Sequence, residues 1–232
     1  MAWLARRTTT PALLALITLG WFAAILAAAI LCGDLLRLAE RPDGSTSFDT
    51  SVTTWMVGHR TGSLTTLARF LSTVGSQKIL IPVAGVAAVL LVGRRRLVLA
   101  GLVVGGWAGA LGLYNLVKHF VHRPRPPADL WLTKVTSTSF PSGHATQSLA
   151  TFVALAFVAA ALVARSGGAA KGLAFALAAG IGWSRVYLGV HWTTDVIAGW
   201  LTGAAWIAAV VWGTQVAIRI ERPPGDQGTV RE

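Results

Sequence analysis

The sequence has little charge, because Asp, Glu, Lys and Arg make up only 12% of its 232 residues. Soluble domains carry about 25% of these residues. Hydrophobic residues make up 54% of the chain, and the mean hydropathy is +0.62. These values exclude an ordinary water-soluble domain and favour a protein embedded in a bilayer. The length fits one membrane-embedded domain over residues 1–232, with no large soluble module.

Cysteine and acidic residues are also scarce. Cys32 is the single cysteine, so no intrachain disulfide can form, and its apolar surroundings are typical of a small buried hydrophobe. Nine acidic residues stand against 20 basic ones, which gives a net charge of +11. The cations lie mostly between apolar runs. They therefore indicate membrane topology, lipid headgroups or an anionic substrate, and we expect no nucleic-acid partner.

Long apolar runs are abundant, and a membrane-spanning helix needs about 20 such residues. Six runs are candidates: Pro11–Cys32, Ile79–Gly93, Leu97–Val117, Ala145–Ala164, Gly172–Val190 and Val196–Ile218. Arg6 and Arg7 before the first run suggest a signal peptide, but that run is longer than a signal core, so we predict a retained helix. The predicted fold class is all-α, a polytopic membrane protein with six transmembrane helices.

The segment between the first two spans is more polar, but apolar residues recur in it at helical spacing. They are Phe48, Val52, Trp55, Met56, Leu64, Leu67, Phe70 and Leu71. Asp49 and Ser51 are candidate caps for the first helix. The pattern predicts one or two amphipathic helices that lie in the interface and cover the site, or alternatively a packed extramembrane loop.

Glycine repeats at every fourth position within the spans, at Gly101, Gly105 and Gly109 and again at Gly199 and Gly203. Such spacing lets helices approach closely in lipid, although a composition rich in Ala and Gly would produce the same pattern.

Six spans place both termini on the same side of the membrane. The Lys and Arg residues divide equally between the two sides, so their number does not decide the orientation. Arg94–Arg96 lies in a very short connector. Cations in short connectors are the strongest indication of the cytoplasmic side of a membrane protein. We predict a plasma-membrane protein with cytoplasmic termini, including a short tail over 220–232, and a site that faces the extracytoplasmic side.

Three motifs lie at the ends of predicted helices on one side of the membrane. They are Lys118 with Arg125-Pro126, then Pro141-Ser142-Gly143-His144, then Ser184-Arg185 with His191 and Asp195. Together they bring three cations, two histidines and one carboxylate to one surface. This shared location is stronger evidence for a site than any single motif.

The cations Lys118, Arg125 and Arg185 suit a phosphoryl group, whose negative charge is spread over several oxygens. Lys118 and Arg125 are also compatible with side chains that reach to the membrane interface. Arg185 interrupts an apolar run, where a charge is costly and typical of a functional site.

The second motif indicates a phosphate seat at a helix N-terminus, which offers unpaired backbone N–H groups. Ser142 is a candidate helix cap or a donor to a phosphate oxygen, and Gly143 permits close approach of the backbone. His144 is expected to face the bound group from the first turn of the helix.

His191 and Asp195 are four residues apart and therefore share one face of a helix. A carboxylate there can fix the imidazole tautomer and leave the other ring nitrogen available for attack. Alternatively, Asp195 only stabilises the positive end of its helix.

A metal site is not expected, because few carboxylates lie near the histidines and three cations would repel a divalent ion. His119 and His122 are interpreted as interfacial polar residues, and Arg123 as a contact to lipid headgroups.

In order and spacing, the three motifs resemble the signature of the type 2 phosphatidic acid phosphatase family, with no departure over Lys118–Pro126, Pro141–His144 and Ser184–Asp195. The resemblance directly covers about 80 residues, the core motifs over 118–195. It implies a metal-independent enzyme without a cofactor that removes phosphate from a lipid through a phosphohistidine. Soluble vanadium haloperoxidases are related, but the apolar runs here argue against that branch.

The resemblance also implies a role for each motif residue. His191 would be the nucleophile, Asp195 would orient it, and His144 would protonate the leaving group. The phosphoryl oxygens would be held by Lys118, Arg125, Ser142, Gly143 and Arg185. Bacterial relatives act on undecaprenyl pyrophosphate, phosphatidylglycerophosphate, phosphatidate or diacylglycerol pyrophosphate.

Two alternatives remain open at the level of sequence. A lipid-linked phosphotransferase would pass the phosphoryl group from His191 to an acceptor other than water. An anion transporter would also place cations within spans, but it would not explain the His–Asp pair. The identity of the lipid and the oligomeric state are not encoded in the motifs.

Overall fold

The computed structural model describes residues 44–163 and 167–221, and all regular secondary structure in these ranges is helical. The predicted all-α class is therefore confirmed. The predicted first span, Pro11–Cys32, lies outside the described residues, and so does the predicted tail beyond Glu221.

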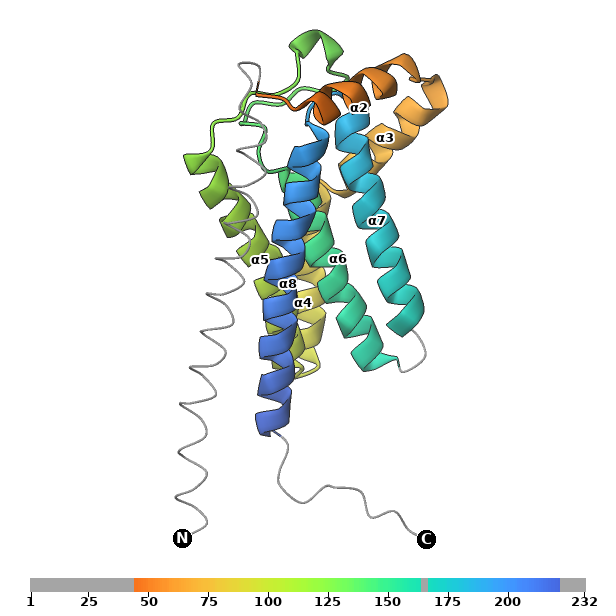
Figure 1. Cartoon of the computed structure of the whole chain (residues 1–232). Helices are drawn as coiled ribbons and strands as arrows, with labels where there is room; N and C mark the ends of the chain where they lie inside the picture. Colours follow the sequence, from red (N-terminus) through yellow and green to blue (C-terminus); the bar gives the residue numbers. More distant parts are fainter. Residues whose placement is uncertain (1–43, 164–166, 222–232) are drawn as a thin grey trace, which may run out of the picture.

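Seven α-helices and one 3-10 turn follow one another along the described chain. They are α2 (Ser47–Gly58), α3 (Gly62–Val74), α4 (Gln77–Gly93), α5 (Leu97–Phe120), η1 (Ala128–Leu130), α6 (Gly143–Leu162), α7 (Gly167–Tyr187) and α8 (Thr193–Glu221). Figure 1 shows α4 to α8 as a bundle of long helices, with α2 and α3 across one end. The loop from 121 to 142 lies at the same end, so the polar connections gather there.

Helix α6 forms the centre of the bundle and packs against α5, α7 and α8. Its buried residues are mostly small, and Ala150 and Ala154 are fully covered. Glycines bring α8 against it: a Cβ atom on Gly199 would lie 2.7 Å from the backbone oxygen of Ser142, and one on Gly203 2.6 Å from that of Thr146. Close packing at the second glycine series is thus confirmed.

The first glycine series is only partly used for helix packing. A Cβ atom on Gly109 would overlap the indole ring of Trp206 in α8, and one on Gly105 would touch Val210. Gly101 meets nothing within 4 Å. Gly105 and Gly109 therefore allow α8 to pack closely against α5. Among the described helices, Gly101 has no packing role and reflects the glycine-rich composition of the chain.

Three described helices are long and apolar enough to cross a membrane, over Leu97–Phe120, Gly143–Leu162 and Thr193–Val216. The pair α3 and α4 forms a fourth candidate, a span broken by a 45° bend. Helix α7 coincides with the predicted fifth span but is not among these candidates. The helical, membrane-embedded character is established by these elements, whereas the number six stays a prediction.

Helices α2 and α3 occupy the segment for which interfacial helices were predicted. Their large apolar side chains point outward, since Trp55 is 59% exposed and Phe70 62%. Their buried residues include the polar Asp49 and Ser72. An apolar outer face with a polar inner face is typical of a helix that touches lipid and covers a polar site.

The cap of α2 differs from the prediction. Thr46 is the N-cap, and its hydroxyl accepts the backbone N–H of Asp49 at 3.0 Å. The Asp49 carboxylate accepts the N–H of Thr46 at 3.2 Å, which completes a capping box. Asp49 therefore supports the cap from the third helical position, and neither Asp49 nor Ser51 is the cap itself.

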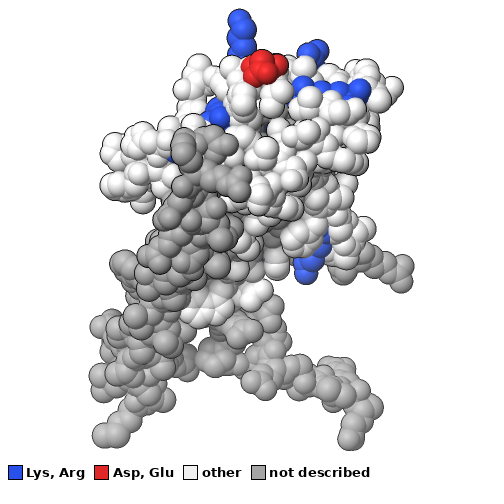
Figure 2. Space-filling view, turned by 45° about the horizontal axis from the view of Figure 1, so that its top comes forward, with Lys and Arg blue, Asp and Glu red and all other residues white. Residues whose placement is uncertain are grey.

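Figure 2 shows a surface that is largely uncharged in the described part of the chain, with most of the visible Lys and Arg toward the end that carries α2 and α3. The sides of the bundle expose apolar residues such as Val86, Val89 and Phe175. This distribution fits a bundle whose sides contact hydrocarbon and whose end contacts water and headgroups.

The contact between α8 and α6 gives a testable stability difference. Gly203→Ala places a methyl group against the Thr146 backbone and should lower the unfolding free energy by about 1–3 kcal/mol. Gly101→Ala is the matched control, because its methyl group enters open space. Thermal unfolding in detergent should separate the two variants. Equal melting temperatures would contradict the packing described here.

Candidate active site

The three sequence motifs meet in one cavity of about 260 Å³ at the end of the bundle that carries α2 and α3. Six predicted site residues line it: Lys118, Arg125, Gly143, His144, Arg185 and His191. The other lining residues are Gly75, Gln77, Tyr114, Val135, Thr136, Ser137 and Gln147. Ser142 and Asp195 are fully buried next to lining residues, since Ser142 precedes Gly143 and Asp195 contacts His191.

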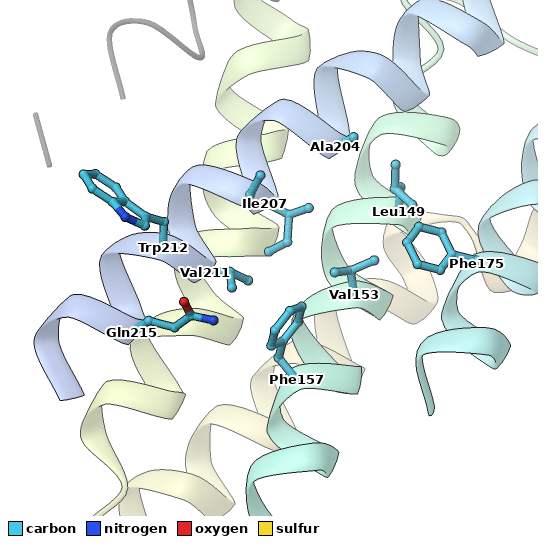
Figure 3. A pocket seen from close by; sticks show the side chains of 10 residues that line it. Leu149, Val153, Phe157, Phe175, Ala204, Ile207, Val211, Trp212 and Gln215 are labelled. Carbon is cyan, nitrogen blue, oxygen red and sulfur yellow. The ribbon is translucent and has the colours of Figure 1, made fainter. Parts of the chain in front are cut away.

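A second cavity of about 380 Å³ lies between α6, α7 and α8 (Figure 3). Its walls are apolar side chains such as Val153, Phe157 and Phe175, and Gln215 is its one polar lining residue. It contains no ionisable group, so the chemistry belongs to the smaller cavity.

Backbone hydrogen bonds fix the motifs relative to one another. The N–H of Ser142 donates to the backbone oxygen of Asp195 at 3.0 Å, which joins the start of α6 to the start of α8. The N–H of Ser139 donates to the backbone oxygen of Arg123 at 3.0 Å, which ties the first motif to the loop before the second. These hydrogen bonds hold motifs that are far apart in sequence next to one another at one end of the bundle.

The turn before His191 depends on a glycine. Gly189 has φ of +75°, and a Cβ atom there would lie 2.3 Å from the backbone oxygen of Leu130. The chain can therefore reverse between α7 and α8 within a few residues and direct His191 into the cavity.

Three cations line the cavity and are held by uncharged groups. Arg125 donates from Nε to the backbone oxygen of Ser137 at 2.7 Å and from a terminal nitrogen to that of Thr138 at 3.1 Å. Lys118 also donates to the Thr138 oxygen, and Arg185 donates to the Ser72 hydroxyl of α3. Within the described residues, none of the three forms an ion pair with a carboxylate. Their positions are fixed while their charge is left for an anion.

Several buried donors at this cavity have no hydrogen-bond partner among the described residues. They include Nε of Arg185, the hydroxyl of Ser142 and Nε2 of Gln147. Ser142 is the N-cap of α6, but its side chain makes no capping bond. A buried donor without a partner is costly, and the oxygens of a bound phosphoryl group would satisfy it.

A side chain larger than that of glycine would not fit at position 143, at the start of α6. A Cβ atom there would lie 2.9 Å from the ring of Tyr114 on α5. The absence of a side chain leaves the N-terminal backbone of α6 open to the cavity, where its N–H groups favour an anion.

His191 and Asp195 form the expected pair, but not on one helical face, because His191 lies in the turn before α8 and only Asp195 lies on the helix. Nδ1 of His191 lies 3.4 Å from Oδ2 of Asp195, which also accepts the Ser139 hydroxyl at 2.5 Å and the Trp192 N–H at 2.9 Å. Nε2 of His191 lies 3.2 Å from a terminal nitrogen of Arg125. With its proton on Nδ1, the imidazole directs the lone pair of Nε2 toward the cation-lined cavity.

The surroundings of His191 keep its imidazole neutral. Burial lowers the pKa of His191 well below its ordinary value, and the charges of Arg125, Arg185 and Lys118 lower it further. Burial also lowers the pKa of Arg125, to about 10, so this guanidinium stays charged at neutral pH. The cavity thus combines a neutral imidazole with fixed positive charge.

The interpretation of Arg123 as a headgroup contact is wrong. Its side chain is only 3% exposed and lies between two carboxylates, 2.6 Å from Oδ1 of Asp195 and 2.8 Å from Oδ2 of Asp49. Its position two residues before Arg125 was the only signal in the sequence. His119 and His122 are exposed, and neither lines the cavity.

No group of three or more His, Cys, Asp or Glu within 44–163 and 167–221 has the arrangement of a metal site. The metal independence of the activity stays a prediction.

A cation-lined cavity with two histidines, at the end of an apolar helical bundle, defines a membrane-embedded protein whose cavity is complementary to an anion such as a phosphoryl group. A family model described as the PAP2 superfamily matches residues 98–219. An undecaprenyl-diphosphatase of Sulfolobus acidocaldarius is 34% identical over 151 residues, which cover 63% of this chain and 68% of that protein. The chain therefore belongs to the PAP2 superfamily.

Two solved structures share this fold. The transmembrane PAP2 type phosphatidylglycerolphosphate phosphatase of Bacillus subtilis has a TM-score of 0.75 at 22% identity, covering 82% of this chain and 96% of that one. LpxE of Aquifex aeolicus has a TM-score of 0.55 at 22% identity, covering 70% of this chain and 94% of that one. Both comparisons show that the helical bundle has the same fold as these two proteins.

The electrostatics of the cavity predict how His191 titrates. Because its pKa is lowered, we expect the imidazole to remain neutral at pH 6.5, where half of a free histidine side chain would be charged. Arg125→Gln removes one nearby cation and should raise the pKa of His191. Histidine NMR spectra, assigned by comparison with His191→Gln, would show both effects. Half-protonation at or above pH 6.5 in the unsubstituted protein would contradict this description.

Proposed function

We propose that the chain hydrolyses a phosphomonoester or pyrophosphate of a membrane lipid, with His191 as the nucleophile. One observation carries the proposal: Nε2 of His191 faces a cavity with three cations that have no carboxylate partner among the described residues. A cavity of this kind is complementary to a phosphoryl group, and it holds an imidazole beside that group.

The first step forms a bond from Nε2 of His191 to phosphorus and breaks the bond from phosphorus to the leaving oxygen. Lys118, Arg125 and Arg185 stabilise the charge that spreads over the other phosphoryl oxygens, together with Ser142 and the backbone at Gly143. With the negative phosphoryl group bound beside it, His144 acts as an imidazolium that gives one proton to the leaving oxygen and becomes neutral. The Asp195 carboxylate stabilises the positive charge that develops on the imidazole of His191.

The second step hydrolyses the phosphohistidine. Water attacks phosphorus, the bond to Nε2 breaks, and inorganic phosphate leaves. His144, now neutral, accepts the proton from the water and is restored for the next cycle. His144 and His191 both line the cavity, so the donor and the nucleophile lie beside the same bound group.

A lipid is the substrate class that the relatives and the membrane setting support. One relative is named for undecaprenyl diphosphate and one for phosphatidylglycerolphosphate, and both of these are phosphorylated lipids. The cavity lies at the end of an apolar bundle, where a headgroup would meet it from the bilayer. We include the polyprenyl pyrophosphate, phosphatidylglycerophosphate and phosphatidate classes.

The membrane arrangement we propose has six spans, cytoplasmic termini and a site on the extracytoplasmic side of the plasma membrane. Its support is the Arg94–Arg96 connector between α4 and α5, at the end of the bundle opposite α2 and α3 (Figure 1). The headgroup would then be dephosphorylated in the outer leaflet.

Two other functions are compatible with parts of the site. A lipid-linked phosphotransferase would use the same phosphohistidine and another acceptor. An anion transporter would use the cations but would have no need for the buried pair of His191 and Asp195.

We expect the purified protein in detergent to release phosphate from lipid phosphates in the presence of EDTA. His191→Ala removes the nucleophile and should reduce kcat by at least about 10³-fold. Asp195→Asn keeps the shape but removes the charge that orients the imidazole, and it should reduce kcat by roughly 10²- to 10⁴-fold. Phosphate release from a panel of lipid phosphates, before and after EDTA, measures all three effects.

His119→Ala is the matched control, because this histidine is exposed and lies outside the cavity. It should retain the activity of the unsubstituted protein. Full activity of His191→Ala would refute the nucleophile assignment, and loss of activity in EDTA would refute metal independence.

The proposed orientation can be tested with single cysteines in a Cys32→Ser background. Ser63→Cys places the thiol at an exposed position of α3. Arg95→Cys places it at an exposed position of the connector at the other end of the bundle. In intact cells, a membrane-impermeant maleimide should label position 63 and spare position 95, and lysis should expose both. The reverse pattern would invert the topology.

A further inference from the structure

We propose that Arg123 and Asp49 are positioning residues that hold the Asp195 carboxylate in place for His191. This inference rests on the proposed function, because it concerns the residue that orients the proposed nucleophile. It assigns a role to Asp49 on helix α2, which lies outside the three motifs, and to Arg123, which lies within the first motif at a position that the motif does not specify.

Arg123 is bound by acceptors on all sides. Its Nε donates to the backbone oxygen of Gly44 at 2.7 Å, and one terminal nitrogen donates to the Thr194 hydroxyl at 2.7 Å and to Oδ1 of Asp195 at 2.6 Å. The other terminal nitrogen donates to Oδ2 of Asp49 at 2.8 Å. A guanidinium held at each nitrogen has one orientation, so it can fix the orientation of a partner.

The two oxygens of Asp195 have different partners. Oδ1 faces Arg123, while Oδ2 faces the Ser139 hydroxyl, the Trp192 N–H and Nδ1 of His191. The contact with Arg123 therefore determines which oxygen is turned to the imidazole. It also places a positive charge 2.6 Å from a carboxylate that is fully buried, which offsets part of the cost of burying that charge.

Asp49 holds the opposite side of the same group. Its Oδ1 accepts the backbone N–H of Thr194 at 2.9 Å, and its carboxylate also accepts the Thr194 hydroxyl. Thr194 precedes Asp195 in the first turn of α8. Asp49 therefore binds both the guanidinium and the helical turn on which Asp195 lies, and α2 becomes part of the support of the site.

Neither residue is placed to touch the substrate, because Asp49 and Arg123 do not line the cavity and their side chains are 0% and 3% exposed. Their effect must pass through Asp195. Loss of either one should lower the rate of the chemical step and leave substrate binding nearly unchanged.

The test is a double-mutant cycle on kcat and KM. Arg123→Lys and Asp49→Asn should each lower kcat by about 10- to 10²-fold, with KM within about threefold of the unsubstituted value, because a small displacement of a catalytic group costs this much. In an Asp195→Asn background, the same changes should lower kcat by less than about threefold further, because the oriented carboxylate is already absent.

Arg60→Gln is the matched control. Arg60 also donates to backbone oxygens, those of Leu130 and Tyr187, but it forms no ion pair with a carboxylate within 44–163 and 167–221. Any loss it causes should therefore be the same in the unsubstituted and Asp195→Asn backgrounds. Thermal unfolding of every variant in detergent would identify those that do not fold. If Arg123→Lys does not fold, the nearly isosteric Asp49→Asn is sufficient for the test.

The outcomes separate the two proposals. Three outcomes would overturn the positioning role while hydrolysis by the unsubstituted protein stands. They are independent, multiplicative losses of kcat in the cycle, an unchanged kcat for folded Asp49→Asn, and a change confined to a rise in KM. Absence of lipid phosphate hydrolysis by the unsubstituted protein would overturn the proposed function itself.

Discussion

A charge buried among apolar helices must have a partner, and this constraint organises the functional end of the molecule. Arg123 lies between Asp49 and Asp195, so these three charges are paired within the protein. Lys118 and Arg125 are held by backbone oxygens instead, which fix them without neutralising them. The paired charges around Arg123 support the structure. The charges of Lys118 and Arg125, which have no carboxylate partner among the described residues, are suited to an external anion.

The bundle makes this division possible. The glycines of α8 allow its backbone to lie against α6, and the Ser142 N–H joins the first turns of both helices through the Asp195 carbonyl. The backbone at Gly143 and the pair of His191 and Asp195 are therefore fixed relative to each other. Helices α2 and α3 complete the enclosure, because Asp49 reaches α8 and Ser72 reaches Arg185.

The sequence predicted which motif residues gather at the cavity, since their spacing places them at helix ends on one side of the bundle. It predicted Arg123 wrongly, because a cation near a helix end looks the same in sequence whether it faces headgroups or two carboxylates. The partner Asp49 is 74 residues away, and no local pattern connects them. The cap of α2 was misplaced for a different, local reason, because Asp49 takes part in the capping hydrogen bonds from three residues after the true cap, Thr46.

The amino-acid sequence by itself determined the apolar helical class, the helix ends that carry the three motifs and the cations suited to phosphate, because these depend on local composition and spacing. Only the tertiary structure decided which cations are neutralised and which are left for a ligand. It also decided that α2 supports the site. Both depend on contacts between distant segments, and burial makes the energy of each charge depend on those contacts.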